Sequence, residues 1–185
     1  MQTSTGFQDS FVDSCNLREQ TMIKHGTAIA IFAVAAATAA SAEELITWGE
    51  VSGWAILIDP SVGNGCLMER QFEDDTLVQF GTVPNRNGGF FAAYNPDWTD
   101  IEDGATGTIK FEFPKIRFTG EVVGVAKEGL YGGYAFFDNP NVTLEFGKNK
   151  NIIILGELGR TINVSLTGTM KAIQAVKQCQ SEQSE

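Results

Sequence analysis

The sequence predicts a mainly β domain, either an antiparallel β-sandwich or a partly closed barrel, with a C-terminal α-helix pinned by a disulfide. Three observations predict this class. Short strand-like runs recur along the chain, bounded by Gly, Pro, Asn or Asp. Only one segment has a clear helical period, and it lies near the C-terminus. A predicted secretion signal, once removed, leaves two cysteines, one in a strand-like run and one in this helix.

The most apolar stretch of the chain has the features of a secretion signal. Residues 27–40 are mostly Ala, Ile, Val, Phe and Thr, and such a run is too short to span a bilayer as a lasting helix. Lys24 precedes it, and residues 40–42, Ala-Ser-Ala, follow it as a cleavage site. We therefore expect residues 22–42 to be a signal peptide, with no stable membrane span after cleavage. A buried apolar helix is the alternative.

This signal divides the chain. Because a signal normally starts at the terminus, we interpret residues 1–21 as a mis-called start or a disordered extension. Residues 43–180 then form a single β-rich domain, and the polar residues 181–185 form a frayed tail. The expected location of the mature protein is the periplasm, or outside the cell after secretion.

The strand-like runs are short, and we expect eight or nine strands. Gly-Asn-Gly at 63–65 favours a hairpin between the first two runs, and Pro114 ends a cleanly alternating one. Both faces of residues 89–94 are apolar, as in a central sandwich strand. The runs span residues 54–58, 66–72, 76–80, 89–94, 108–113, 116–125, 131–137, 151–155 and 161–166.

Residues 169–180 have the one convincing helical period, and Thr167 or Thr169 could cap the helix start. Residues 139–148 could form a shorter helix, opened by Asn-Pro. The apolar stripe of the C-terminal helix consists of Ala172, Ile173, Val176 and Cys179.

The cysteine count changes when the signal leaves. Cys15 is removed with it, and Cys66 and Cys179 remain. In an oxidising compartment an even pair predicts a disulfide, which here would pin the helix onto the sheet. Two buried free thiols are the alternative.

Composition excludes several kinds of chemistry. The sole histidine, His25, leaves with the signal, so the mature chain cannot carry a Ser-His-Asp triad or a His-ligated zinc or haem. Phosphate-cradling and dinucleotide-binding glycine motifs are missing, and we expect no cofactor. The net charge of −10 predicts that the protein does not bind nucleic acid.

One acidic loop remains as a candidate site. Asp97, Asp100, Glu102 and Asp103 crowd a turn-rich segment, and oxygen ligands this dense can hold calcium. Their spacing matches no recognised calcium loop, so a solvated acidic turn is the commoner outcome, and we expect no other metal site. The same acids could supply the carboxylate pair of a glycan-acting enzyme.

Aromatic residues are the second candidate. Tyr94, Trp98, Tyr131 and Tyr134 fall in two ring-rich segments. Exposed rings of this kind could stack on sugars or anchor a protein partner. The alternative is that these residues belong to the core.

Three segments resemble known proteins. The sequences at 53–66, 87–98 and 166–179 are similar to a family of small exported alphaproteobacterial proteins with a two-cysteine β-domain. That resemblance implies an N-terminal signal and a Cys66–Cys179 pair, and it implies no catalytic residue. The chain also resembles, more faintly, invasion-associated locus B proteins, which are secreted β-domains.

Exclusion points to a non-enzymatic periplasmic or secreted β-domain that binds a protein or an envelope component. One alternative is a carboxylate-based enzyme that acts on glycans. Another is a hydrolase inhibitor, which would need a rigid exposed loop such as residues 85–89.

We predict that the protein recovered from cells begins at Glu43, because signal peptidase cuts after a small-x-small motif. Mass spectrometry of the intact protein checks this. A peptide from residues 1–21 found in cells would contradict the assignment of the translation start.

Overall fold

The computed structural model describes residues 44–84, 86, 88–127 and 129–183; the predicted extension and signal, residues 1–42, lie outside them. The described chain forms one ten-stranded sheet, two α-helices and two short 3-10 turns. The elements are β1 (Ile46–Val51), β2 (Trp54–Asp59), η1 (Pro60–Val62), β3 (Gly65–Gln71), β4 (Leu77–Gly81), β5 (Gly89–Tyr94), β6 (Thr106–Glu112), β7 (Arg117–Lys127), β8 (Leu130–Phe137), α1 (Pro140–Lys148), β9 (Asn151–Leu155), η2 (Glu157–Gly159), β10 (Thr161–Ser165) and α2 (Thr169–Glu182).

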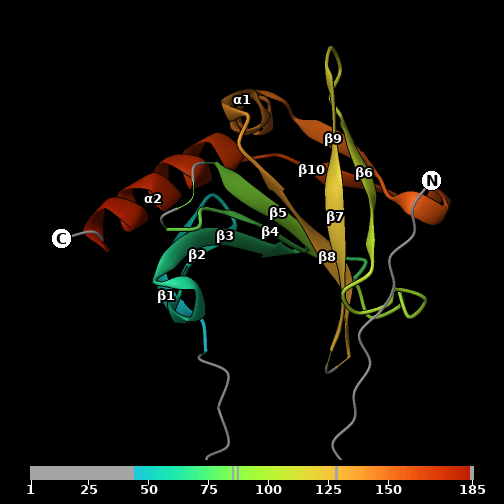
Figure 1. The fold of residues 1–185 in the computed structure, drawn as a ribbon. Helices are drawn as coiled ribbons and strands as arrows, with labels where there is room; N and C mark the ends of the chain where they lie inside the picture. The colour runs from blue at the N-terminus through green and yellow to red at the C-terminus, as the bar shows by residue number, and fades with distance from the viewer. Residues whose placement is uncertain (1–43, 85, 87, 128, 184–185) are drawn as a thin grey trace, which may run out of the picture. The chain divides into compact units, whose positions relative to one another are not determined.

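The sheet is antiparallel throughout and is not closed. Its strand order is β1-β2-β3-β4-β5-β8-β7-β6-β9-β10, so β1 and β10 are its two edges. Figure 1 shows the sheet curling, with α2 running across the side of β1 to β3 and α1 lying over one end. The predicted mainly β class is confirmed, and it takes the form of one curled sheet.

β1 was not predicted from sequence. Its register with β2 shifts between Thr47 and Gly49, and such a bulge interrupts the two-residue alternation by which a strand is found. The hairpin predicted at residues 63–65 is confirmed. Gly63 and Asn64 both have positive φ between η1 and β3.

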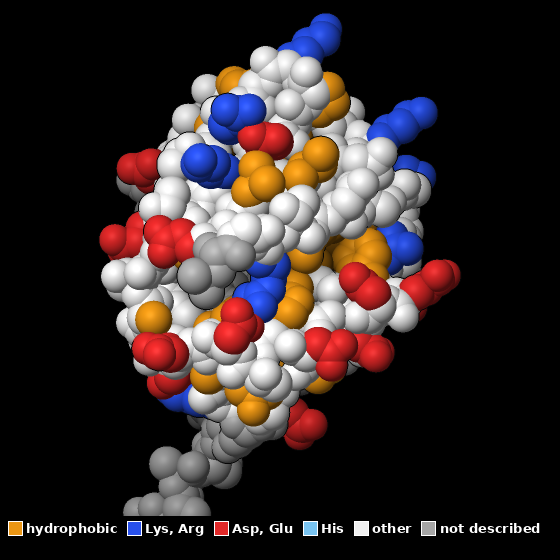
Figure 2. Space-filling model, turned by 90° about the vertical axis from the view of Figure 1, so that its right-hand side faces the viewer, with side chains coloured by type: hydrophobic (Ala, Val, Ile, Leu, Met, Phe, Trp, Pro, Cys, Tyr) orange, Lys and Arg blue, Asp and Glu red, His pale blue; other side chains and the backbone are white. Residues whose placement is uncertain are grey.

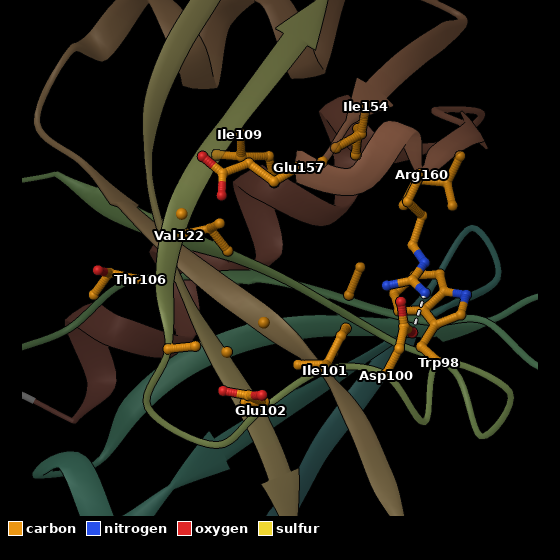
Figure 3. Close-up of a pocket in the computed structure, with 18 of the residues that line it drawn as sticks. Trp98, Asp100, Ile101, Glu102, Thr106, Ile109, Val122, Ile154, Glu157 and Arg160 are labelled. Atoms are coloured by element: carbon orange, nitrogen blue, oxygen red, sulfur yellow. Dashed lines mark hydrogen bonds and ion pairs between the residues drawn. The ribbon is translucent and has the colours of Figure 1, made fainter.

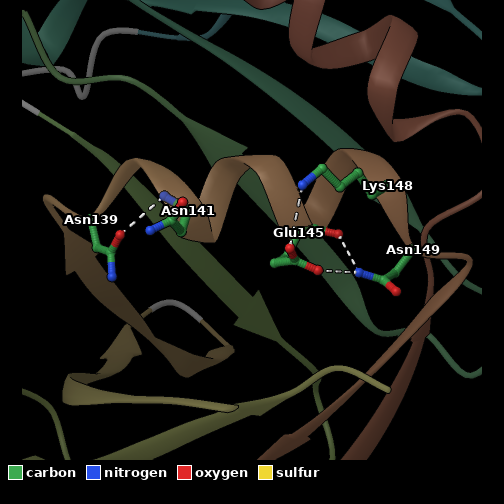
Figure 4. Close-up of polar contacts among 5 residues, drawn as sticks. All are labelled: Asn139, Asn141, Glu145, Lys148 and Asn149. Carbon is green, nitrogen blue, oxygen red and sulfur yellow. Dashed lines mark hydrogen bonds and ion pairs between the residues drawn. The ribbon is translucent and has the colours of Figure 1, made fainter. Parts of the chain in front are cut away.

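The shorter predicted helix is confirmed as α1. The Asn139 side chain caps it by accepting a hydrogen bond from the Asn141 N–H at 3.0 Å, and Pro140 follows the cap. At the other end the Asn149 amide donates to the Glu145 carbonyl, at 2.9 Å, and Lys148 pairs with the Glu145 carboxylate (Figure 4). Both ends of this short helix are therefore satisfied.

The helix predicted at residues 169–180 is also confirmed, as α2, which continues through Glu182. The predicted cap is wrong: the N-cap residue is Gly168, with positive φ and no side-chain hydrogen bond. Instead, the Thr169 hydroxyl oxygen lies 2.7 Å from the Phe146 carbonyl oxygen and 2.8 Å from the Leu166 carbonyl oxygen, and the hydroxyl donates a hydrogen bond to these carbonyls. Thr169 is fully buried, so its hydroxyl ties the start of α2 to the end of α1.

The core lies on the concave face of the sheet, where α1 closes it. Phe146 of α1 is 1% exposed. Its ring centroid lies 4.8 to 5.9 Å from four other phenylalanine rings, contributed by three strands and the turn after β6. Those rings belong to Phe80, Phe91, Phe111 and Phe113.

A disulfide joins Cys66 of β3 to Cys179 of α2, across 113 residues. Because the two cysteines are bonded to each other, the alternative of two free thiols is wrong. Both cysteines are fully buried.

Among the described residues, neither α1 nor α2 has the length and apolar character that a membrane-spanning helix needs.

We predict that replacing both cysteines by alanine lowers the free energy of unfolding by about 2–5 kcal/mol, with the chain-entropy model giving about 4.8 kcal/mol as an upper figure. Urea unfolding measures the change. Reductant should destabilise the wild-type protein and leave the double variant unaffected; equal stability of the oxidised wild type and the variant would contradict the prediction.

Candidate functional site

A cavity of about 290 Å³ opens inside the curl of the sheet. Phe91 and Ala93 of β5, together with Ile109, Ile154 and Ile162, supply much of its apolar wall. These side chains are inward-facing members of β5, β6, β9 and β10. The loop after β5 and the 3-10 turn η2 complete the wall, as Figure 3 shows.

The cavity exists because small residues meet in one row of the sheet. Ala93 of β5 pairs with Gly133 of β8, and Gly133 pairs with Gly124 of β7. Three adjacent strands therefore place almost no side-chain volume at this level. A β-carbon at Gly133 would lie 2.9 Å from Cγ2 of Val122, closer than real β-carbons come, so glycine also lets the neighbouring wall approach.

A charged wall stands on one side of the cavity. The guanidinium carbon of Arg160 lies 5.0 Å from the centre of the Trp98 ring, and the guanidinium also donates a hydrogen bond to the Asp100 carboxylate (Figure 3). That hydrogen bond lowers the pKa of Asp100 below its ordinary value. The Asp100 carboxylate is therefore held ionised, which suits an electrostatic wall and does not suit a general acid.

The other acids near the cavity have structural partners or face solvent. Glu157 accepts a hydrogen bond from the Thr108 N–H at 2.9 Å. Asp103 accepts one from the Ala126 N–H and pairs with Lys127 at 3.6 Å. Figure 2 shows acidic side chains crowding the lower half of this side of the molecule, with hydrophobic patches between them.

The acidic loop does not assemble a metal site in the structure. Within residues 44–84, 86, 88–127 and 129–183, no group of three or more His, Cys, Asp or Glu is arranged to hold an ion. Asp97 is exposed, and its N–H donates to the Asn95 side chain at 2.9 Å in a local turn. Asp100, Glu102 and Asp103 serve instead as part of the cavity rim or of the ion pairs described above.

The four predicted aromatic residues are half-buried, and they separate into different places. Trp98 lines the cavity. Tyr94 and Tyr134 lie on the opposite, convex face of the sheet, since they alternate with the cavity-lining Ala93 and Gly133. Tyr131 lies at the start of β8, where its carbonyl accepts from the Asn95 N–H at 2.8 Å.

The convex face carries a cluster of rings. The Tyr134 and Phe136 centroids are 5.3 Å apart, Phe90 lies beside Phe136 at 6.5 Å, and the Arg86 guanidinium lies 4.0 Å above Phe136. Burial, and secondarily the neighbouring Tyr134 and Glu69, raise the pKa of Tyr94 to about 12. The Tyr94 hydroxyl therefore remains a hydrogen-bond donor at every physiological pH.

Comparison with known proteins finds a resemblance in fold. Neither protein-family models nor curated proteins match the sequence. Among solved structures, invasion associated protein B from Bartonella henselae matches with a TM-score of 0.54 at 12% identity, over 75% of this chain and 99% of that one. The faint likeness to invasion-associated locus B proteins is thus supported at the level of the fold. The resemblance to small exported alphaproteobacterial proteins stays a prediction.

Sequence reasoning missed most of the cavity. Arg160 was not predicted as a site residue, because it lies 60 residues from the acid that it pairs with. The glycines of β7 and β8 that form the cavity floor were not predicted from sequence. The signal that could have found this floor is the accumulation of Gly at inward-facing positions of neighbouring strands, which requires the strand pairing to be known.

We predict that Arg160→Gln raises the pKa of Asp100 toward 3.8, its ordinary value, because the donated hydrogen bond is lost. The lowered pKa means that the pairing stabilises the fold above the unfolded-state pKa and is lost as pH falls through the folded-state pKa. NMR titration of the side-chain carboxyl carbon measures this. Lys127→Gln, which removes the partner of Asp103, is the control; an unchanged Asp100 midpoint in Arg160→Gln would contradict the prediction.

Proposed function

We propose that this protein is a non-enzymatic binding domain that works outside the cytoplasm. Its cavity would receive an apolar group of a protein or an envelope component. One observation carries the proposal: most of the cavity wall is built from apolar side chains and glycines, and the charged side chains Asp100, Glu102, Glu157 and Arg160 lie at separate places around it (Figure 3). Pockets of this kind bind through apolar contact and use a few polar groups for orientation.

The acids around the cavity do not favour the rival carboxylate enzyme. Glycan hydrolysis needs a carboxyl group whose pKa is raised, so that it can donate a proton. Arg160 lowers the pKa of Asp100, and Glu157 is held against the backbone of β6. Neither acid is arranged as the proton donor of such a pair.

The location rests on the disulfide and on the predicted signal. A buried disulfide across 113 residues suits an oxidising compartment. The structural neighbour is named invasion associated protein B. We propose that this chain is exported and contacts molecules beyond the cytoplasmic membrane.

We predict that the disulfide-bonded protein binds the neutral dye N-phenyl-1-naphthylamine at one site, seen as increased dye fluorescence. Trp98→Ala and Ile101→Ala, which remove cavity wall, should weaken binding by about fivefold or more, since each strips apolar contact.

Trp48→Ala is the matched control. Trp48 is also a half-buried indole, but it lies on edge strand β1, where it donates to Glu182 of α2 at 2.8 Å. Equal losses in Trp48→Ala and Trp98→Ala, or no saturable dye binding by the wild-type protein, would overturn the proposal. Release of reducing sugar from peptidoglycan by the purified protein would favour the enzymatic rival.

A further inference from the structure

The two edge strands of the sheet are protected to different degrees. β1 has a shifted register, an exposed Glu50, and a side-chain hydrogen bond from Trp48 to α2. A bulge, a charge and a covering helix are the devices by which proteins keep an edge from pairing with another chain. β1 is therefore protected against pairing with a strand of another chain.

β10 has none of these devices. Its five residues, Thr161–Ser165, contain no charge and no proline. They pair with β9 in five consecutive positions without a register shift. A regular, uncharged edge of this kind is a template for another extended strand.

The register shows which backbone groups are free. The Leu166 N–H donates to the Lys150 carbonyl and the Gly156 N–H donates to the Arg160 carbonyl. In an antiparallel pair every second residue exchanges hydrogen bonds with the partner strand. Residues 162 and 164 therefore bond to β9, whereas Thr161, Asn163 and Ser165 direct their N–H and C=O groups to the open edge. No backbone partner for these three residues is found in the part of the chain that the structure describes.

The open edge borders a second cavity, of about 350 Å³. Four consecutive residues of β10, from Ile162 to Ser165, line one side. Consecutive residues point to opposite faces of a strand, so the cavity meets β10 from its edge. Residues 70–74 and Thr76, at the turn between β3 and β4, line the opposite side. We name this cavity the edge slot.

Arg70 is the one cation among the residues that line the edge slot, and the acids Glu73 and Asp74 of the β3–β4 turn line it as well. The Arg70 guanidinium carbon lies 5.2 Å from the centre of the Phe72 ring and 5.9 Å from that of Trp54. It takes part in no ion pair among the residues the structure describes. A guanidinium held by two rings and lacking a carboxylate is prepared to bind one.

We propose that the edge slot binds an extended segment of a partner protein, which adds to β10 as a further strand. The added segment would exchange hydrogen bonds with Thr161, Asn163 and Ser165, as in strand addition generally. Its inward side chains would be apolar, because they would cover the half-buried Ile162 and Phe72. One of its outward or terminal groups would be a carboxylate that reaches Arg70.

A second copy of this chain fits the edge slot less well. The β3–β4 turn stands opposite the strand edge, so an extended segment can enter where a folded domain would meet the turn. β10 itself carries no acidic residue for Arg70. The edge slot shares Ile162 with the apolar cavity and no other lining residue, and this inference stands independently of the proposed function.

The test begins with a displayed library of random peptides of about ten residues, selected on the disulfide-bonded protein. We expect enriched sequences that alternate apolar and polar residues and include an acid. In NMR hydrogen exchange, a selected peptide should slow the amides of Thr161, Asn163 and Ser165. The amides of residues 162 and 164, already bonded to β9, should exchange slowly with or without peptide.

Asn163→Pro should weaken peptide binding by about tenfold or more relative to Asn163→Ala, because proline removes an edge N–H that β9 does not use. Arg70→Gln should weaken the binding of peptides that carry an acid and leave unchanged the binding of the same peptides with that acid replaced by its amide. All three variants should bind the naphthylamine dye as the wild-type protein does. Thr161→Pro replaces Asn163→Pro if the latter does not fold.

Three results would overturn the inference. One is a library that yields no alternating sequence. Another is a selected peptide that binds without slowing the three edge amides, or that binds Asn163→Pro and Asn163→Ala equally. The third is a concentration-dependent dimer that protects the same amides without peptide, which would assign the edge to a second copy.

Discussion

The packing of Phe146 is the interaction on which the rest of the structure depends. A single sheet with an apolar concave face must cover that face itself, and α1 does so by inserting one ring among four others from β4, β5, β6 and the turn after β6. Rings packed edge-on and tilted at such distances are stabilising beyond the area they bury. The buried hydroxyl of Thr169 then links α1 to α2, and the disulfide links α2 to β3.

This arrangement fills the curl of the sheet unevenly. Near α1 the concave face is packed with aromatic rings, whereas the row of Ala93, Gly133 and Gly124 leaves the cavity. The disulfide and α2 hold β1 to β3 on the other side of the curl. Because these features are held by the same core, a ligand in the cavity and a strand at β10 would each meet a preformed surface, which lowers the entropy cost of binding.

Much of the fold could be predicted from local patterns. The alternation of Ile109, Phe111 and Phe113 predicted β6, and the Asn-Pro pair predicted the start of α1. The apolar stripe that ends in Cys179 predicted the buried face of α2. Two local predictions failed for physical reasons: the bulge hid β1, and the Thr169 hydroxyl is used for a tertiary hydrogen bond instead of a helix cap. The apolar outer face of β5 suggested a second sheet, but among the described residues that face carries the partly exposed ring cluster instead.

By itself, the sequence determined the strand-rich class and the two cysteines that could pair, one in a strand and one in the C-terminal helix. These properties depend on composition and on contacts between near neighbours, which are readable along the chain. Only the tertiary structure decided that one sheet curls on itself, that Arg160 meets Asp100 and Trp98, and that small residues from three strands align into a floor. Each of these depends on which strands pair and in what register, and that choice is made by the packing of the whole core.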